Sequence, residues 1–399
     1  MATIPSIAMI PSGYKASKLY SVLPTNGDGD FTTTRSTVAT RFNKDGFREE
    51  VAPNIPRLDY SDGGCPSLLL EFASTNILVQ SNQFDVTWSN LSTTVTSGHL
   101  GLDGTNSAWL LSKSANSSAN IRQNISFSGI YTFSVYLKKG TNASAVLRSG
   151  GGTGARFKID LSNGSVIGTQ NTISTSIKSM RDNWYRCSMT FSASPNTDVR
   201  IYPESPLSAS TAGNIYIQYA QLEQNSFATS SIDTQGTAQT RGADTANGSG
   251  NSTLINSSEG VLYAEISALA ADTGIEGLSI SSGSTSNRVV IFTKNPFSPN
   301  TIRATVTSSG VNTFDASVTI SDITNINKIA LKYKQNDFAL WINGVEVNAD
   351  FSGLTPIGLS KLNFGVDGVG SANFIGKTND LRVYTTALSD SELTTLTTI

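Results

Sequence analysis

A chain of 399 residues is too long for a single ordinary core, so two or three domains are expected. Its 28 Lys and Arg nearly balance its 30 Asp and Glu, and no basic cluster stands out, so nucleic acid binding is not expected. No apolar run approaches the roughly 20 residues that cross a bilayer, so membrane insertion is not expected either. Charged residues make up only 15% of the chain, and Ser, Thr, Asn and 34 Gly take their place, which is typical of β-strands joined by many turns.

Residues 1–75 consist of short pieces separated by Pro and Gly, with little sustained periodicity. Such a segment buries little by itself, so we expect an extended arm that is ordered by docking onto another body, with a small hairpin around Gly46. Its last part, RLDYSDGGCPSLLLE, is interpreted as a turn followed by a strand. Gly63 and Gly64 permit a tight reversal, and a buried strand starts at Ser67.

Residues 76–242 contain several segments in which apolar and polar residues alternate. In YTFSVYL, Tyr131 and Phe133 share one face, which is the period of a half-buried strand. In WYRCSMTF, Cys187 falls on the apolar face, so we expect a buried, inert thiol and no disulfide with Cys65. Several such strands separated by turns predict an antiparallel sandwich of the jelly-roll type.

The polar stretch 234–253, TQGTAQTRGADTANGSGNST, is interpreted as a linker or a domain boundary. Strands resume in residues 243–399, where the Asn343-Gly344 pair between ALWI and VEV predicts a two-residue type I′ hairpin turn. Near the C-terminus, SDSE starting at Ser389 has the spacing of a capping box and predicts a short helix.

Three sets of residues carry a resemblance to a known family. The run FTTTRSTVATRFNKDGFREEVAPNIPRLDYSDGGCPSLLLEFASTNIL resembles the amino-terminal module of bacteriophage virion proteins of the tail-fibre and head-fibre type, in which FTR-, ATR-, NPR- and CPSLLLE-type motifs precede variable sandwich domains. Phe72 stands where a proline is usual after LLLE. The middle segment, with YTFSVYLKKGT, WYRCSMTF and TRGAD, is similar to a carbohydrate-binding-module-like jelly roll. The last segment, with GVLYAEIS, ALWINGVEV and DLRVYTTALSDSEL, is similar to concanavalin A-like, laminin-G-like sandwiches.

This resemblance implies an all-β protein made of a virion-docking arm (1–75), a jelly-roll sandwich (76–242) and a concanavalin A-like sandwich (243–399). It implies a place on the surface of the virion, where the arm binds other virion proteins and the sandwiches bind glycans of the host surface. We expect a homo-oligomer, because linked copies of weak sites gain effective concentration, and a trimer is our hypothesis for its form.

Two other functions stay open: a decoration or connector protein that binds no sugar, and a polysaccharide-degrading enzyme. Retaining glycosidases of the concanavalin A-like type carry paired carboxylates on one strand, whereas YAEISALAAD offers Glu265 alone. The single histidine, His99, lies in a polar loop, and nothing in the sequence pairs it with Cys65. We therefore expect no enzyme, no catalytic residue and no cofactor. Calcium is left open, since its ligands would come from non-adjacent turns.

Sugar binding without catalysis needs an exposed aromatic ring beside amides or carboxylates. The loop TKNPFSPN presents an aromatic ring between two amides, although a packed loop tip is a competing interpretation. Trp184 and Trp341 lie in strands and are expected in the core. The carbohydrate-binding candidates are Asn295, Phe297, Asn300 and Trp109.

Overall fold

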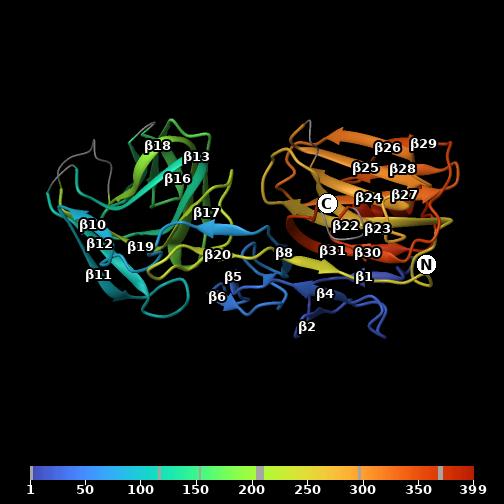
Figure 1. Cartoon of the computed structure of the whole chain (residues 1–399), viewed down its shortest axis with the longest axis horizontal. Coiled ribbons are helices and arrows are strands. Elements are labelled where there is room, and N and C mark those ends of the chain that lie inside the picture. Colours follow the sequence, from blue (N-terminus) through green and yellow to red (C-terminus); the bar gives the residue numbers. More distant parts are fainter. Residues whose placement is uncertain (1–2, 116–117, 152–153, 204–210, 295–297, 367–371) are drawn as a thin grey trace. The chain divides into compact units, whose positions relative to one another are not determined.

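The protein is all-β: its antiparallel sheets form sandwiches, and the only α-helix among the described residues is α1 (Asp390–Thr397) near the C-terminus (Figure 1). The fold class expected from the sequence is therefore confirmed. The computed structural model describes residues 3–115, 118–151, 154–203, 211–294, 298–366 and 372–399.

The chain divides into two compact units that are discontinuous in sequence. The first unit comprises residues 1–36, 51–72 and 243–399, and the second comprises residues 37–50 and 73–242. The segment expected to be an arm is thus shared between the two units, and residues 73–242 are inserted between two parts of the first unit. The expected limits of three consecutive domains stay a prediction, but the compact units do not follow them at the N-terminal end.

The first unit is a sandwich of an eight-stranded and a five-stranded antiparallel sheet. The eight-stranded sheet has the order β29 (Val345–Asp350), β28 (Phe338–Ile342), β27 (Asn327–Lys334), β22 (Glu259–Ala268), β31 (Gly376–Tyr384), β8 (Ser67–Leu70) and β7 (Leu58–Asp59), with β1 (Ile7–Met9) also paired to β31. The five-stranded sheet has the order β26 (Val311–Thr319), β25 (Thr301–Ser308), β24 (Arg288–Lys294), β23 (Glu276–Ser281) and β30 (Lys361–Asn363).

The N-terminal residues supply part of the core of this sandwich. Ile7, Met9 and Phe31 are fully buried among apolar residues of both sheets, and the ring of Phe31 lies 5.2 Å from that of Phe364. These residues are therefore ordered by packing within the first unit of the same chain, and docking of the segment onto another body stays a prediction. A four-stranded sheet joins it to the residues after the insertion, in the order β2 (Tyr14–Lys15), β3 (Lys18–Leu19), β4 (Phe31–Thr34) and β21 (Thr245–Asn247).

Two local predictions in the first unit are confirmed. Asn343 and Gly344 have φ of 52° and 87° between the paired strands β28 and β29, as a type I′ turn requires. Ser389 caps α1, and Ser389 and Glu392 form both bonds of a capping box. The helix covers part of the outer face of the eight-stranded sheet, where Leu393 packs in one cluster with Trp341.

The second unit is built around two long strands, β13 (Asn120–Lys139) and β18 (Trp184–Tyr202). They pair with each other along most of their length, with register shifts between Asn124 and Gly129, and such bulges let a strand continue from one layer of a sandwich into the other. The sheet has the order β11 (Thr93–His99), β12 (Ala108–Lys113), β19 (Gly213–Glu223), β13, β18, β14 (Ser144–Gly151), β15 (Arg156–Asp160) and β16 (Ser165–Gln170), with β10 (Trp88–Leu91) on β13 and β17 (Ser174–Ser179) on β18.

The core of the second unit agrees with the alternation in the sequence. Cys187 is fully buried beside apolar residues of β13 and β18, it forms no disulfide, and burial raises the pKa of its thiol. Trp184 is also buried, as expected. The smaller elements are a 3₁₀ helix at Arg181–Asn183, the strand pair β5 (Ala39–Phe42) and β6 (Arg48–Val51), and the strand pair β9 (Ser74–Asn76) and β20 (Gln239–Arg241).

Candidate functional site

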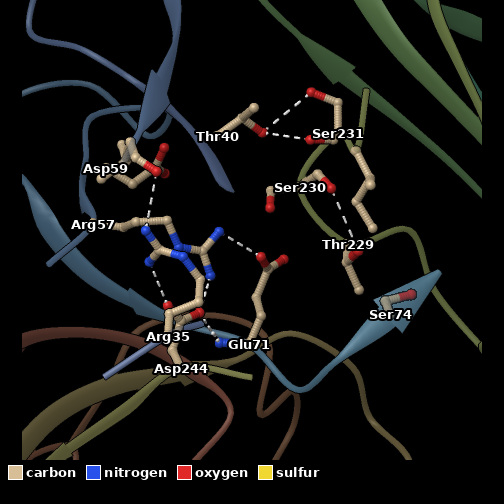
Figure 2. Close-up of polar contacts among 12 residues, drawn as sticks. Arg35, Thr40, Arg57, Asp59, Glu71, Ser74, Thr229, Ser230, Ser231 and Asp244 are labelled. Atoms are coloured by element: carbon tan, nitrogen blue, oxygen red, sulfur yellow. Dashed lines mark hydrogen bonds and ion pairs between the residues drawn. The ribbon is translucent and has the colours of Figure 1, made fainter. Parts of the chain in front are cut away.

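Arg35, Arg57 and Glu71 of the N-terminal segment meet Asp244 in a buried ionic cluster of the first unit (Figure 2). Asp244 Oδ1 accepts a hydrogen bond from Arg35 Nη1 at 2.8 Å, and its Oδ2 contacts Arg57 Nη2. Glu71 Oε2 accepts from Arg57 Nη1 at 2.6 Å, and the Glu71 backbone N–H donates to Asp244 Oδ2 at 3.0 Å. Each of these side chains is at most 5% exposed. Burial opposes the charge of Arg57, but Asp244 and Glu71 outweigh it and raise its pKa.

The stretch 234–253, interpreted as a linker or a domain boundary, contains the limit between the two compact units, after Gly242. The stretch contains β20, Asp244 and β21, and its order follows from the buried partners of Asp244 rather than from its own composition. The cluster is closed to solvent and satisfies its own charges, so its role is to hold the N-terminal segment on the first unit.

The stretch RLDYSDGGCPSLLLE forms a turn and a strand, as the sequence predicts. Gly63 and Gly64 have φ of 78° and 69°, and Ser67 begins the buried strand β8. The aspartates before the turn bind the ammonium group of Lys377, which lies 2.9 Å from Asp59 Oδ2 and also contacts Asp62. The acidic residues of this loop are thus occupied by a structural ion pair.

The residues predicted to bind sugar are placed as follows. Trp109 is only 9% exposed, and its ring lies 6.2 Å from that of Phe84 within the core of the second unit, so the expectation of an exposed ring is wrong. Asn300 Oδ1 accepts a hydrogen bond from the backbone N–H of Ile323 at 3.1 Å and fixes its own loop. Asn295 and Phe297 lie outside the described residues.

The second unit contains a cavity of about 840 Å³ whose walls are mainly hydroxyl and amide groups. Its volume falls within the range of about 300–1,000 Å³ that is usual for ligand sites. No sequence pattern marks this cavity, because its residues come from distant segments that the fold brings together. It is lined by Thr37, Val38, Ala39, Thr40, Glu50, Ser81, Asn82, Gln83, Tyr219, Ser231, Ile232, Asp233, Thr234, Gln235, Gln239, Thr240 and Arg241.

Hydrogen bonds hold the walls of this cavity in place. Thr40 Oγ1 donates to the Ser231 carbonyl at 2.7 Å, which ties β5 to the segment that follows β19 (Figure 2). Thr234 N–H donates to Ser81 Oγ at 2.9 Å, and the Ser81 carbonyl accepts from Ala220 N–H at 2.8 Å. The walls are therefore preformed rather than assembled by a ligand.

A stacked charged group supports one side of the cavity. The guanidinium of Arg48 lies 3.8 Å from the centre of the Tyr219 ring, its Nε donates to Ser231 Oγ at 2.7 Å, and its Nη2 contacts Asp233. The hydroxyl of Tyr219 donates to Asp103 Oδ2 at 3.0 Å. Burial raises the pKa of Tyr219 to about 12, so the hydroxyl stays protonated at neutral pH.

Tyr219 also has an unusual backbone conformation. Its φ is +48°, in the left-handed region that non-glycine residues rarely adopt. Asn82 holds it there: Asn82 Oδ1 accepts from Tyr219 N–H at 3.1 Å, and Asn82 Nδ2 donates to the Ser107 carbonyl at 3.1 Å. Strained residues that are fixed in this way are frequent at binding sites.

Several side chains of the cavity remain available to a ligand. Gln83, Gln235 and Glu50 are exposed, and none of them forms a side-chain hydrogen bond within the described part of the chain. Together they offer two amides and one carboxylate, which donate to and accept from neutral polar groups. Among the described residues, no group of three or more His, Cys, Asp or Glu is placed to hold a metal ion. In the same part of the chain, no helix is both long and apolar enough to span a membrane.

Comparison with known proteins finds distant similarity in fold. No family model and no curated protein matches the sequence. The CBM40 domain of the Ruminococcus gnavus IT-sialidase, bound to α2,3-sialyllactose, is 16% identical with a TM-score of 0.32, and the match covers 38% of this chain and 93% of that one. Domain 4 of AbnA, a GH43 extracellular arabinanase from Geobacillus stearothermophilus in complex with arabinotriose, is 15% identical with a TM-score of 0.32, over 39% of this chain and 73% of that one. These likenesses concern the β-sandwich fold and carry no ligand or activity over to this chain.

Proposed function

We propose that this protein binds glycans through the cavity of its second unit and that it is part of a bacteriophage virion appendage. The observation that carries the first half is the lining of the cavity. Hydroxyl and amide groups both donate and accept hydrogen bonds, as sugar hydroxyls do, and only three lining residues, Glu50, Asp233 and Arg241, are charged. A lining of this kind suits a neutral, polyhydroxylated ligand better than an ion or an apolar molecule.

The virion assignment is supported by the sequence resemblance of the N-terminal segment. Because Ile7, Met9 and Phe31 are used inside the first unit, contact with other virion proteins falls to the apolar residues that the segment leaves exposed. Ile4, Tyr20 and Val22 are 77%, 40% and 47% exposed and are available for this contact. These residues also favour the second candidate function, a decoration or connector that binds no sugar.

We further propose that the protein is a non-enzymatic homo-oligomer, with a trimer as the working form, on the particle surface. A native mass at a multiple of the 42.2 kDa of one chain supports this, and a monomer at all concentrations contradicts it.

The glycan proposal is tested by binding of the full chain to an array of bacterial surface polysaccharides. The double variant Gln83→Ala, Gln235→Ala removes two available amides, and we expect binding to fall about tenfold or more, since each hydrogen bond contributes roughly 1 kcal/mol. The matched control is Gln170→Ala, which removes an exposed amide of β16 outside the cavity and leaves binding unchanged.

Two outcomes contradict the proposal for this site. Equal binding by the double variant and the parent chain excludes the cavity, and binding to no polysaccharide favours the decoration function. Release of reducing ends from a bound polysaccharide would instead reveal an enzyme.

A further inference from the structure

A second cavity, of about 610 Å³, lies in the first unit, on the outer face of the eight-stranded sheet beside α1. The glycan site proposed above makes no use of it. Strands β22, β27 and β31 provide its floor, and α1 provides a wall. It is lined by Thr3, Tyr263, Glu265, Lys328, Asp380, Arg382, Tyr384, Leu388, Ser391, Glu392, Thr395 and Leu396.

The floor of this cavity is a row of charges set by the strand register. Lys328, Glu265 and Asp380 lie opposite one another on three adjacent strands. In the next row, Arg382 lies opposite Tyr263. Side chains directly opposite on neighbouring strands have Cβ atoms about 4.5–5.5 Å apart, so cations and carboxylates stand side by side here.

The charges are paired, but the pairs leave bonding capacity free. Arg382 Nη2 lies 2.6 Å from Asp380 Oδ2, whereas Lys328 Nζ lies 3.9 Å from Glu265 Oε2, beyond hydrogen-bond distance. Glu265 Oε1 accepts one hydrogen bond, from Asn379 Nδ2 at 3.2 Å, and a carboxylate has about four acceptor positions. Burial raises the pKa of Asp380 despite the opposing effect of Arg382.

Tyr263 adds a hydrogen-bond donor to the same floor. Its side chain forms no hydrogen bond with any described residue, although it lines the cavity. Burial, together with Glu265 and Asp380, raises its pKa, so the hydroxyl keeps its proton at neutral pH. The hydroxyl can therefore donate to a ligand or a water that enters the cavity.

The wall beside this floor is fixed. Glu392 of α1 accepts a hydrogen bond from Thr3 Oγ1 at 2.6 Å and closes the capping box with Ser389. Leu388 belongs to the apolar cluster that holds α1 on the sheet. The cavity therefore does not depend on a movable helix.

We propose that this cavity is a second carbohydrate-binding site, which takes a neutral sugar through two neighbouring hydroxyl groups. Each sugar hydroxyl donates to one carboxylate, Glu265 or Asp380, and accepts from a donor beside it, Lys328, Arg382 or Tyr263. An ionic ligand of either sign would meet two like charges on the floor, whereas a neutral diol meets only complementary groups. The site is independent of the cavity in the second unit, so one chain would carry two sugar sites.

The test uses saturation-transfer NMR on the full chain that carries Gln83→Ala and Gln235→Ala, so that binding at the site in the second unit is weakened. The probes are methyl α-mannopyranoside, methyl α-glucopyranoside and methyl β-galactopyranoside. We expect at least one probe to give a saturation-transfer signal in this background. Replacing Glu265 by Ala should weaken the affinity for that probe about tenfold or more, because hydrogen bonds to charged groups are the strong ones.

The first unit offers a matched control on the same two strands. Glu259 of β22 pairs with Lys334 of β27, with Lys334 Nζ 3.5 Å from Glu259 Oε2, and neither residue lines the cavity. Glu259→Ala should leave the signal unchanged. Tyr263→Phe removes a single oxygen and should weaken binding severalfold, so it serves as the test if Glu265→Ala does not fold.

Two results overturn the proposal. One is the absence of a signal for all three probes at tens of millimolar in the background variant, and the other is a signal that Glu265→Ala and Tyr263→Phe both leave unchanged. A loss of polysaccharide binding caused by Gln83→Ala and Gln235→Ala tests only the site in the second unit. The two proposed sites can therefore be contradicted independently of each other.

Discussion

Asp244 holds three segments of the first unit together with one carboxylate. It accepts hydrogen bonds from Arg35 and Arg57 and from the backbone of Glu71, and it is only 4% exposed. The two arginines need this carboxylate, because a buried guanidinium without a partner is costly. At the scale of single residues, Arg35, Arg57 and Glu71 are thus held by one buried carboxylate arrangement.

Replacing Asp244 by Ala leaves two buried arginines short of a partner. We expect the free energy of unfolding of the first unit to fall by about 3–5 kcal/mol. The control is Asp315→Ala, which breaks a surface pair with Arg303 whose side chains are 38% and 32% exposed and should cost less than about 1 kcal/mol. Urea denaturation measures both, and equal losses would contradict the structural role of the cluster.

Sequence reasoning found some of these residues and missed others for physical reasons. Cys187 was predictable because alternation along one strand determines which face is buried. Asp244 was not, because a polar composition indicates exposure only on average and its arginine partners lie far away in the sequence. The row of Lys328, Glu265 and Asp380 was also hidden, because each residue comes from a different strand and only the sheet register joins them.

At the scale of elements, signals within a few residues were reliable. The turn at Asn343 and the cap at Ser389 depend on local backbone geometry, and both are confirmed. Strand lengths were less predictable. The alternation in YTFSVYL starts at Tyr131, whereas β13 begins at Asn120 and runs through Gly129 at φ of 108°, because pairing with β18 continues on both sides.

The capping box of α1 gives the helix a pH dependence. The pKa of Glu392 is lowered from 4.5 to about 2, first by the Thr3 hydroxyl and then by the amide and hydroxyl of Ser389. Because the pKa of Glu392 in the folded chain lies below its ordinary value, the ionised carboxylate stabilises α1 above pH 4.5. This contribution is lost as the pH falls from about 4.5 to about 2.

We therefore expect the helical Cα chemical shifts of residues 390–397 to decrease over that pH interval. In Glu392→Gln the same signals should stay constant over the interval and lie below the neutral-pH values of the parent chain. A transition of equal size in the Gln variant would assign the pH dependence to another group.

At the scale of the whole molecule, the second unit is largely an insertion in the first. The backbone N–H of Asp244 donates to the carbonyl of Glu71 at 2.8 Å, so the chain of the first unit leaves and returns at adjacent peptide groups. Within the insertion, β9 and β20 pair at its two ends. No local sequence signal reveals that the chain leaves and returns at adjacent positions, because residues 73–242 lie between these positions in the sequence.

Joining Phe72 to Ala243 by a short Gly-Ser linker should leave the first unit folded. The linker only has to span adjacent backbone positions, so its closure entropy is small. Circular dichroism during heating shows whether the shortened chain is folded and unfolds cooperatively. Asp244→Ala should destabilise the shortened chain as it does the full chain. A shortened chain without cooperative unfolding would show that the first unit needs the insertion.

The adjacency of Glu71 and Asp244 also bears on how such a chain changes between relatives. The coding segments for LLLE and for RGAD flank the inserted unit, so two genetic crossovers, one in each segment, exchange that unit and restore the ionic cluster in the recombinant. The donor sequence needs only the same two flanks, whatever the length of what lies between. The inserted unit is then replaced while residues 1–72 and 243–399 stay the same.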